Sequence, residues 1–190
     1  MKETEIKLKV PDVSSLVSKL TGMSFAVSGD RNFEDNWVFD YPDFRLGNGL
    51  MLLRLRQVGG RTILTFKGPS EGDRQYKIRE EIECTVSDAS SIRAILLALG
   101  LREVFRYQKW RTEYRFSGQP EGHVLLDETP IGDYVELEGP PDWIDLTAQS
   151  LGYSARDYIL KSYWALYLED CAQKRVRPAL MLFKPAEREE

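Results

Sequence analysis

Short segments in which charged and apolar residues alternate constrain the fold of this chain more than any other feature. They run through residues 1–10, 50–69, 74–86, 105–116, 123–130 and 133–139. Alternation with a period of two is typical of β-strands, because successive side chains of a strand point to opposite faces of the sheet. The pattern therefore predicts antiparallel strands with one apolar face and one charged face.

The composition of the charged face is unusual. Its positions carry almost only Arg, Lys, Glu and Asp, and uncharged polar residues are nearly missing. A solvated outer face explains the charges of any single strand, but such a face normally mixes Thr, Ser, Gln and Asn with them. Because the same bias returns on strand after strand, we favour a sheet that closes into a barrel with its charged face inward.

Such a barrel would bring many bases and acids together in its interior. These are Lys7, Arg54, Arg56, Lys67, Lys77, Arg79, Lys109 and Arg111, and Glu3, Glu5, Glu81, Glu83, Asp127, Glu136 and Glu138. Burying so many ions without water is strongly unfavourable. A wet interior removes this difficulty if the bases meet a polyanion and the acids meet divalent cations. Triphosphate fits this pattern, since arginines from several strands can grip its separate charges, and oxygen ligands favour Mg²⁺ or Mn²⁺.

Helical spacing of apolar residues appears in four other segments. It predicts helices over 11–20, 87–101, 142–153 and 154–172. Ser87 is the expected N-cap of the second helix, and Ser154 and Asp157 have capping-box spacing at the start of the fourth. Lys161 is therefore expected on a helix surface.

Turn residues and chain length complete the expected organisation. A strand is expected near 33–39, followed by a loop over 40–49, and Gly59 and Gly60 predict a hairpin turn with positive φ. We expect one domain over 1–175 and an extended tail over 176–190. Leu180, Leu182 and Phe183 are the expected docking residues of that tail.

Composition argues against several classes of protein. No apolar run approaches the about 18 residues of a membrane helix, and the start has no signal-peptide pattern, so we expect a cytoplasmic protein. The single histidine, His123, nearly excludes a Ser-His-Asp triad or a multi-histidine metal site. Cys84 and Cys171 lie far apart and are expected to be buried thiols. The net charge of -4 argues against an extended nucleic-acid surface.

An ordered set of motifs carries a resemblance to a known family. Glu3, Glu5 and Lys7 form an E-x-E-x-K strand, and "DYPD", "LLRLR", "TFKGP", "KIREEIE", "KWRTEY", "LLDETPIGDYVELEG" and "KSY" follow in order. This set resembles the CYTH domain, or triphosphate tunnel metalloenzymes, which includes class IV adenylate cyclases, thiamine triphosphatases and inorganic tripolyphosphatases. The resemblance runs from Lys2 to about Leu168.

The resemblance implies an α+β fold, an eight-stranded antiparallel β-barrel (tunnel) with flanking helices, open at both ends and holding triphosphate with Mg²⁺ or Mn²⁺. It also implies roles for individual residues. The implied metal ligands are Glu3, Glu5, Asp127, Glu136 and Glu138. The implied phosphate-binding residues are Arg54, Arg56, Lys67, Arg79, Lys109 and Arg111. Lys7, Glu81 and Glu83 are implied catalytic residues, which would grip a phosphate, hold a second metal or position the attacking group.

Three functions remain open. Hydrolysis of a triphosphate compound such as tripolyphosphate, thiamine triphosphate or a nucleotide is favoured, because it needs only the interior residues. A class IV adenylate cyclase, which converts ATP to cyclic AMP and pyrophosphate, is the first alternative. Against it, the chain has "DRNFEDNWVFD" where a glutamine or histidine-phenylalanine signature is expected before the second strand. The second alternative is a non-catalytic polyphosphate-binding module. The expected partner is a small-molecule triphosphate, with no nucleic acid or membrane, and the family makes a homodimer plausible.

Overall fold

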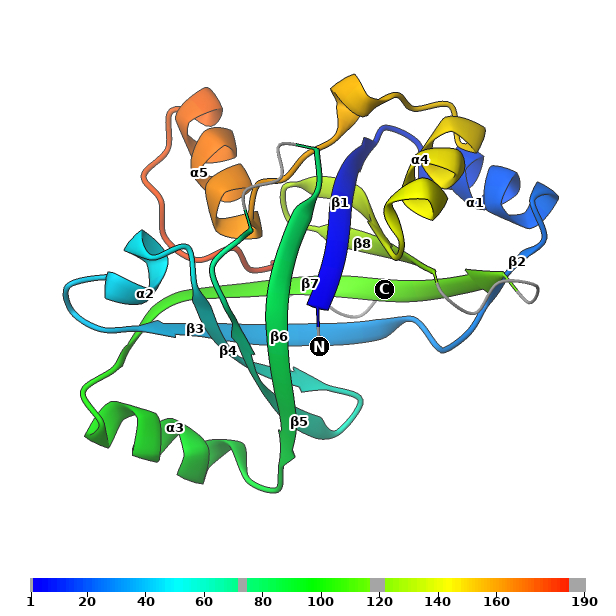
Figure 1. Ribbon diagram of the computed structural model, residues 1–190. Helices are drawn as coiled ribbons and strands as arrows, with labels where there is room; N and C mark the ends of the chain where they lie inside the picture. Colours follow the sequence, from blue (N-terminus) through cyan, green and yellow to red (C-terminus); the bar gives the residue numbers. More distant parts are fainter. Residues whose placement is uncertain (1, 72–74, 117–121, 185–190) are drawn as a thin grey trace.

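The computed structural model describes residues 2–71, 75–116 and 122–184. Within these ranges one antiparallel sheet closes on itself (Figure 1). Its strand order is β7-β3-β4-β5-β6-β1-β9-β8, and β8 pairs with β7 to complete an eight-stranded barrel, with the short β2 attached to β7. The predicted barrel is therefore confirmed. The strands are β1 (Lys2–Val10), β2 (Phe25–Val27), β3 (Asn32–Asp40), β4 (Leu52–Val58), β5 (Arg61–Lys67), β6 (Lys77–Val86), β7 (Arg102–Phe116), β8 (His123–Thr129) and β9 (Gly132–Glu138).

The strand register brings charged residues opposite one another. Gly59 and Gly60 turn β4 into β5 with φ of 52° and 75°, as predicted for a tight hairpin. Glu5 lies opposite Lys77 on one neighbouring strand and opposite Glu138 on the other. Because side chains alternate along each strand, these pairings repeat every second residue on the inner face. We call the charged interior of the barrel the tunnel.

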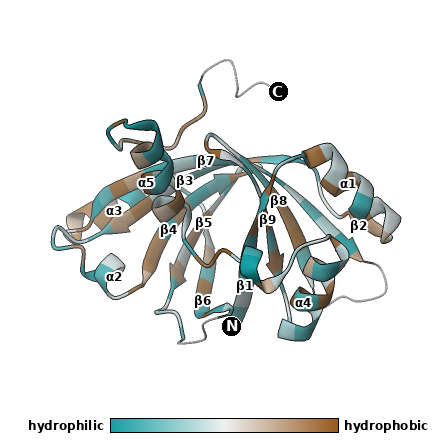
Figure 2. Cartoon of the chain, turned by 90° about the horizontal axis from the view of Figure 1, so that it is seen from above, coloured by the Kyte–Doolittle hydropathy of each residue, from teal (hydrophilic) through white to brown (hydrophobic). Residues whose placement is uncertain are grey.

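The apolar faces of the strands point outward, and helices cover much of them. The helices are α1 (Val13–Gly22), α2 (Arg45–Asn48), α3 (Ala89–Ala98), α4 (Pro141–Ser150), the 3-10 turn η1 (Ala155–Asp157) and α5 (Tyr163–Lys174). Leu20 of α1 and Ile144 of α4 pack on Ile6 and neighbouring strand residues, and Leu96 of α3 packs on Leu55. Each fully buried side chain of this kind stabilises the fold by about 1.5–3 kcal/mol. Figure 2 shows the resulting alternation of hydrophilic and hydrophobic residues along the strands.

α5 packs against the barrel through aromatic residues. Tyr163 and Leu166 form a buried cluster with Phe105 and Tyr134 of the barrel strands. Met181, beyond the helix, joins this cluster and exchanges backbone hydrogen bonds with β7. The tail thus docks through Met181 and through Phe183, whose ring lies 6.3 Å from that of Phe33, whereas Leu180 is exposed. Residues 185–190, the rest of the predicted tail, lie outside the described residues.

The predicted helix over 154–172 is wrong in its first half. Ser154 and Asp157 do form a capping box, but it opens only the turn η1, and α5 begins at Tyr163 with Ser162 as its N-cap. The residues between are extended, because Ile159 exchanges two backbone hydrogen bonds with Lys7, just beyond the part of β1 that pairs with β6. The prediction that Lys161 lies on a helix is therefore also wrong.

Four smaller expectations also need correction. The N-cap of α3 is Asp88, whose carboxylate accepts the N–H groups of Ser90 and Ser91, and not Ser87. The expected loop over 40–49 contains α2, and the expected strand over 74–86 begins at Lys77, with residue 74 outside the described residues. Cys84 is exposed on the outer face of β6, whereas Cys171 is buried as predicted. Among the described helices, none is long and apolar enough to span a membrane.

Candidate active site

The tunnel contains a cavity of about 1170 Å³. Thirteen of the fourteen predicted site residues line it: Glu3, Glu5, Lys7, Arg54, Arg56, Lys67, Arg79, Glu81, Glu83, Lys109, Arg111, Glu136 and Glu138. Asp127 is the exception among the fourteen. The period of two along six strands thus brings together residues that lie up to 135 positions apart in the sequence. Their individual roles stay predictions.

Three carboxylates form a cluster on one side of the cavity. Glu3 and Glu5 are two residues apart on β1, so they share its inner face, and Glu138 lies opposite Glu5 on β9. Each contributes an oxygen, and these oxygens all lie within 4.8 Å of one another. Such a set of hard oxygen ligands fits a divalent ion such as Mg²⁺ or Mn²⁺.

Glu138 is the least compensated member of this cluster. Within the described part of the chain it has no cation within 4.0 Å, whereas Glu5 lies 2.7 Å from Lys77 and 3.5 Å from Lys7. Burial, together with the negative charges of Glu136 and Glu3, raises the pKa of Glu138 to about 8. Glu5 is different: burial opposes its ionisation, but Lys7 and Lys77 hold its pKa well below the usual value. The cluster therefore lacks positive charge at Glu138, which a divalent cation would supply.

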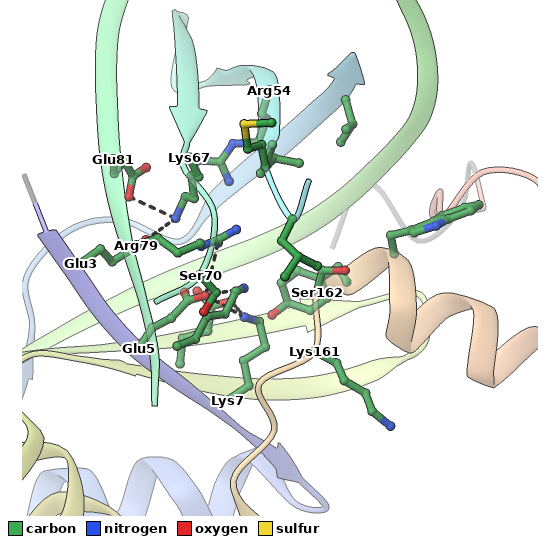
Figure 3. Close-up of a pocket in the computed structure, with 18 of the residues that line it drawn as sticks. Glu3, Glu5, Lys7, Arg54, Lys67, Ser70, Arg79, Glu81, Lys161 and Ser162 are labelled. Atoms are coloured by element: carbon green, nitrogen blue, oxygen red, sulfur yellow. Dashed lines mark hydrogen bonds and ion pairs between the residues drawn. The ribbon is translucent and has the colours of Figure 1, made fainter. Parts of the chain in front are cut away.

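Basic side chains face the carboxylates from the neighbouring strands. Lys67 lies between Glu3, at 2.6 Å, and Glu81, at 3.1 Å (Figure 3). Burial raises the pKa of Glu81 to about 7, the charge of Lys67 opposes this rise, and Glu3 adds to it. Among the described residues, Arg79 has one acid within 4.0 Å, Glu5 at 3.6 Å. This part of the cavity therefore combines cations with carboxylates that compete for them.

Three arginines have unused hydrogen-bond donors. The Nε groups of Arg54, Arg56 and Arg79 are buried without a partner in the described part of the chain. Their terminal nitrogens are partly engaged: Arg54 donates to Tyr107 Oη at 3.3 Å, and Arg56 lies 3.1 Å from Glu83. An unpaired buried donor is unfavourable unless a ligand or water accepts its proton. The arginines fit the oxygens of a bound anion.

Asp127 lies behind the cavity wall and not in the carboxylate cluster. It accepts hydrogen bonds from Lys109 at 2.8 Å, from Arg111 at 2.6 Å and from the hydroxyl of Tyr163 at 2.6 Å, and it is fully buried. Glu136 is likewise engaged, by Lys7 at 3.1 Å and by Arg111. The family resemblance implied both acids as metal ligands. Neither belongs to the three carboxylates whose oxygens lie within 4.8 Å of one another, and their roles stay predictions.

Ionisation of the paired groups follows from their neighbours. For Lys7, burial opposes the charged form, but Glu136 and Glu5 outweigh it and raise the pKa. For Glu136, burial again opposes ionisation, and Lys7 and Arg111 lower the pKa well below its usual value. Burial also raises the pKa of the Tyr163 hydroxyl, and Asp127 adds to this effect, so Tyr163 remains a hydrogen-bond donor. Lys7 and Glu136 therefore stay charged, and Tyr163 stays neutral, across the neutral pH range.

The sequence analysis missed several residues of the tunnel. Glu34 is buried on β3 between Arg56, at 3.2 Å, and Lys109, at 3.6 Å. Although burial opposes its ionisation, Lys109 and Arg111 lower its pKa. The alternation of Glu34 with Asn36 along β3 was the available signal. Tyr163, which holds Asp127, lies in the "KSY" motif that carried no assigned role.

Comparison with known proteins agrees with this geometry. The sequence profile of the CYTH domain matches residues 1–163. The chain is 31% identical over 139 residues to a putative adenylate cyclase of Methanocaldococcus jannaschii, which covers 73% of this chain and 77% of that protein. It is 30% identical over 138 residues to the adenylate cyclase CyaB of Aeromonas hydrophila, 71% and 67% of the two chains.

A solved structure extends the comparison to the fold. A putative adenylyl cyclase from Hippeastrum, described as having a dominant triphosphatase activity, superposes with a TM-score of 0.63 at 17% identity. The match covers 88% of this chain and 95% of that one. At this identity the likeness concerns the fold. The profile match spans most of the chain, and the closed, charged barrel is the architecture that the motifs predicted. The chain therefore belongs to the CYTH domain family.

Proposed function

We propose that the protein is a divalent-metal-dependent enzyme that hydrolyses a triphosphate compound in the tunnel. The observation that carries this proposal is the content of one cavity. It brings together the carboxylates Glu3, Glu5 and Glu138, whose oxygens lie within 4.8 Å of one another, and arginines whose buried Nε donors have no partner among the described residues. A polyanion bound together with a divalent cation would satisfy both.

The three clustered carboxylates fit a divalent cation and would hold Mg²⁺ or Mn²⁺. When bound, such an ion neutralises phosphate oxygens and stabilises the charge that develops as the P–O bond breaks. This role needs Glu3 to be free, and Glu3 is bonded to Lys67 at 2.6 Å. We therefore expect Lys67 to turn from Glu3 towards a phosphate oxygen when the metal and the triphosphate are both present.

Basic and acidic residues of β4 and β6 would bind the phosphates and position the attacking water. Arg54, Arg56 and Arg79 would donate their N–H groups to phosphate oxygens, which fixes the chain of the substrate and disperses its charge. Glu81 and Glu83, two residues apart on β6, would orient a water molecule towards the terminal phosphorus. Attack by that water breaks the bond to the bridging oxygen and releases orthophosphate.

A cyclase remains the second candidate, because two relatives at 30% and 31% identity are named adenylate cyclases. The same grip on the phosphates serves both reactions, and only the nucleophile differs. In the cyclase the ribose 3′-hydroxyl of ATP attacks the α-phosphorus and pyrophosphate leaves. The third candidate, a polyphosphate-binding module without turnover, would need no metal ligands, and it is disfavoured by the intact carboxylate cluster.

One experiment separates the three candidates. The protein is incubated with Mg²⁺ or Mn²⁺ and, in turn, tripolyphosphate, thiamine triphosphate and ATP, and the products are followed by phosphorus NMR. Hydrolysis predicts orthophosphate as the first product and its loss in Glu5→Gln, with the fold checked by circular dichroism. Cyclic AMP with pyrophosphate from ATP would establish the cyclase instead. Tight binding with no product from any compound would leave the binding module.

A further inference from the structure

Helix α5 contributes a polar side chain to the wall of the tunnel cavity, and the proposed mechanism does not use it. This side chain is Tyr163, the first residue of the helix, which lines the cavity although it belongs to no strand of the barrel. The residue is buried. Because the hydroxyl of a buried tyrosine usually has a hydrogen-bond partner, the surroundings of this hydroxyl indicate what the residue does.

The hydroxyl of Tyr163 holds one oxygen of Asp127. It donates to Oδ2 at 2.6 Å, and the same oxygen accepts Lys109 Nζ at 2.8 Å and a terminal nitrogen of Arg111 at 2.6 Å. The other oxygen, Oδ1, accepts Arg111 Nε at 2.5 Å. Asp127 is fully buried, so solvent does not replace a donor that it loses. The tyrosine is the neutral member of the three donors.

The ring of Tyr163 is fixed by its neighbours. It lies edge-on to the ring of Tyr134, with centroids 5.8 Å apart, and 5.9 Å from the ring of Tyr107. Its centroid is also 5.4 Å from Lys7 Nζ and 5.3 Å from Lys109 Nζ, within the range of cation–π contacts. The direction of the hydroxyl is therefore set before a substrate binds.

Lys109 is the cation whose position depends on this arrangement. It lines the cavity, and its Nζ has two acids within 4.0 Å among the described residues, Asp127 at 2.8 Å and Glu34 at 3.6 Å. A phosphate oxygen in the cavity would compete with these acids for the ammonium group. If Lys109 turned to the phosphate, Oδ2 of Asp127 would lose one donor, which is unfavourable for a buried carboxylate.

The tyrosine hydroxyl lowers the cost of this movement. Arg111 donates to both oxygens of Asp127 and also pairs with Glu136, so two acids fix its position. With Tyr163 present, Oδ2 keeps two donors when Lys109 moves away. Without the hydroxyl it would keep one, and Asp127 would hold Lys109 more firmly.

We propose that Tyr163 is a positioning residue of the site: its hydroxyl holds Asp127 in place and so leaves Lys109 able to bind a phosphate oxygen. This inference rests on the proposed function, because it takes Lys109 as a ligand of the triphosphate. The hydroxyl acts through Asp127 and not on the substrate itself. It makes α5 a part of the active site through one hydrogen bond.

Binding measurements on folded variants test the proposal without relying on turnover. Dissociation constants of tripolyphosphate are measured by calorimetry with Ca²⁺, which takes the same kind of oxygen ligands as Mg²⁺. Tyr163→Phe keeps the ring and removes only the hydroxyl, and it should weaken binding about threefold to tenfold. Circular dichroism and melting curves check that the variant is folded at the temperature of the measurement.

Tyr134→Phe is the matched control. Tyr134 is buried in the same aromatic cluster, but its hydroxyl accepts a hydrogen bond from Lys9 at 3.3 Å, and it is not among the described residues that line the cavity. A general disturbance of the cluster would appear in both variants. We expect Tyr134→Phe to bind tripolyphosphate within about twofold of the wild type.

A double-mutant cycle identifies the route of the effect. In Lys109→Ala the ammonium group is absent, so the hydroxyl of Tyr163 has nothing left to release. Lys109→Ala and the double variant Lys109→Ala with Tyr163→Phe should therefore bind tripolyphosphate within about twofold of each other. A tyrosine that only stabilised the fold would weaken binding by the same factor with and without Lys109.

The outcomes separate the two proposals. Wild-type affinity in Tyr163→Phe, an equal loss in Tyr134→Phe, or the same loss with and without Lys109 would overturn the positioning role and leave the proposed function standing. Failure of the wild-type protein to bind tripolyphosphate would overturn the proposed function together with the role of Tyr163.

Discussion

Two groups of acids in the same tunnel have opposite surroundings. Asp127, on the β7–β8 side, receives hydrogen bonds from Lys109, Arg111 and Tyr163 and has no capacity to spare. Glu138, on the β1–β9 side, has no cation within 4.0 Å in the described part of the chain. Asp127 is buried and Glu138 is half-buried, and both are acids on strands, so residue type does not distinguish them. Compensated acids stabilise the barrel, and uncompensated ones are available to a ligand.

The largest expected effect concerns the compensated side. Asp127→Asn leaves Lys109 and Arg111 without their shared counter-ion, so the free energy of unfolding should fall by about 3–5 kcal/mol. Urea denaturation measures this loss. A fall below about 1 kcal/mol would mean that Asp127 is not a structural acid, and the comparison with Glu138 would collapse.

Glu138→Gln should raise the free energy of unfolding when no divalent metal is present. The folded-state pKa of about 8 lies above the unfolded value of 4.5, so the wild-type protein loses stability as the pH rises between these values. The glutamine of the variant does not ionise, so the variant does not lose this stability. Its free energy of unfolding should be higher than that of the wild type by about 1–2 kcal/mol at pH 9 in EDTA, with no difference at pH 4. Melting curves at the two pH values check the sign. Added Mg²⁺ should stabilise the wild type and not the variant.

Arg79→Ala extends the comparison of compensated and uncompensated groups to the arginines of the tunnel. Arg79 contacts one acid among the described residues, Glu5 at 3.6 Å, and its buried Nε has no partner there, so its removal should lower stability less than the removal of Arg56. It should weaken tripolyphosphate binding about tenfold to a hundredfold, the value of a charge-assisted hydrogen bond. Calorimetry with Arg56→Ala in parallel is the control, because Arg56 is bonded to Glu34 and Glu83 and its loss should lower stability as well.

The smallest effect is expected at Lys161. Its ion pair with Glu169, at 2.6 Å, is exposed on both sides and contributes about 0.5 kcal/mol or less. Lys161→Ala should therefore melt within about 2 °C of the wild type. A larger change would show that exposure alone does not decide which ion pairs of this molecule matter.

The family resemblance carried by the motifs was sufficient for the closed barrel, and the alternation of residues was sufficient for the charged face of most strands. A period of two is a local property, so the inward position of Glu3, Glu5 and Lys7 follows from β1 alone. The glycine pair at Gly59 and Gly60 also fixes the register of its hairpin locally. The contents of the tunnel were therefore predictable one strand at a time.

The partners inside the tunnel were not predictable in this way. Asp127 meets Tyr163, and Glu138 meets Glu3, only because strands distant in sequence lie side by side. Glu34 was missed because β3 mixes an inward acid with an outward one, Asp35, which pairs with Arg106 at 2.6 Å. In each case long-range register decides which acid is compensated, and one sequence without homologues does not contain it.

The hydrogen bonds between Lys7 and Ile159 tie the carboxylate strand to the segment that leads into α5. Lys7 is two residues from Glu5, and Ile159 is five residues from Trp164. A shift of the segment before α5 would therefore act directly on the strand that carries two of the clustered glutamates. The position of α5 and the spacing of these carboxylates are thus connected through two backbone hydrogen bonds.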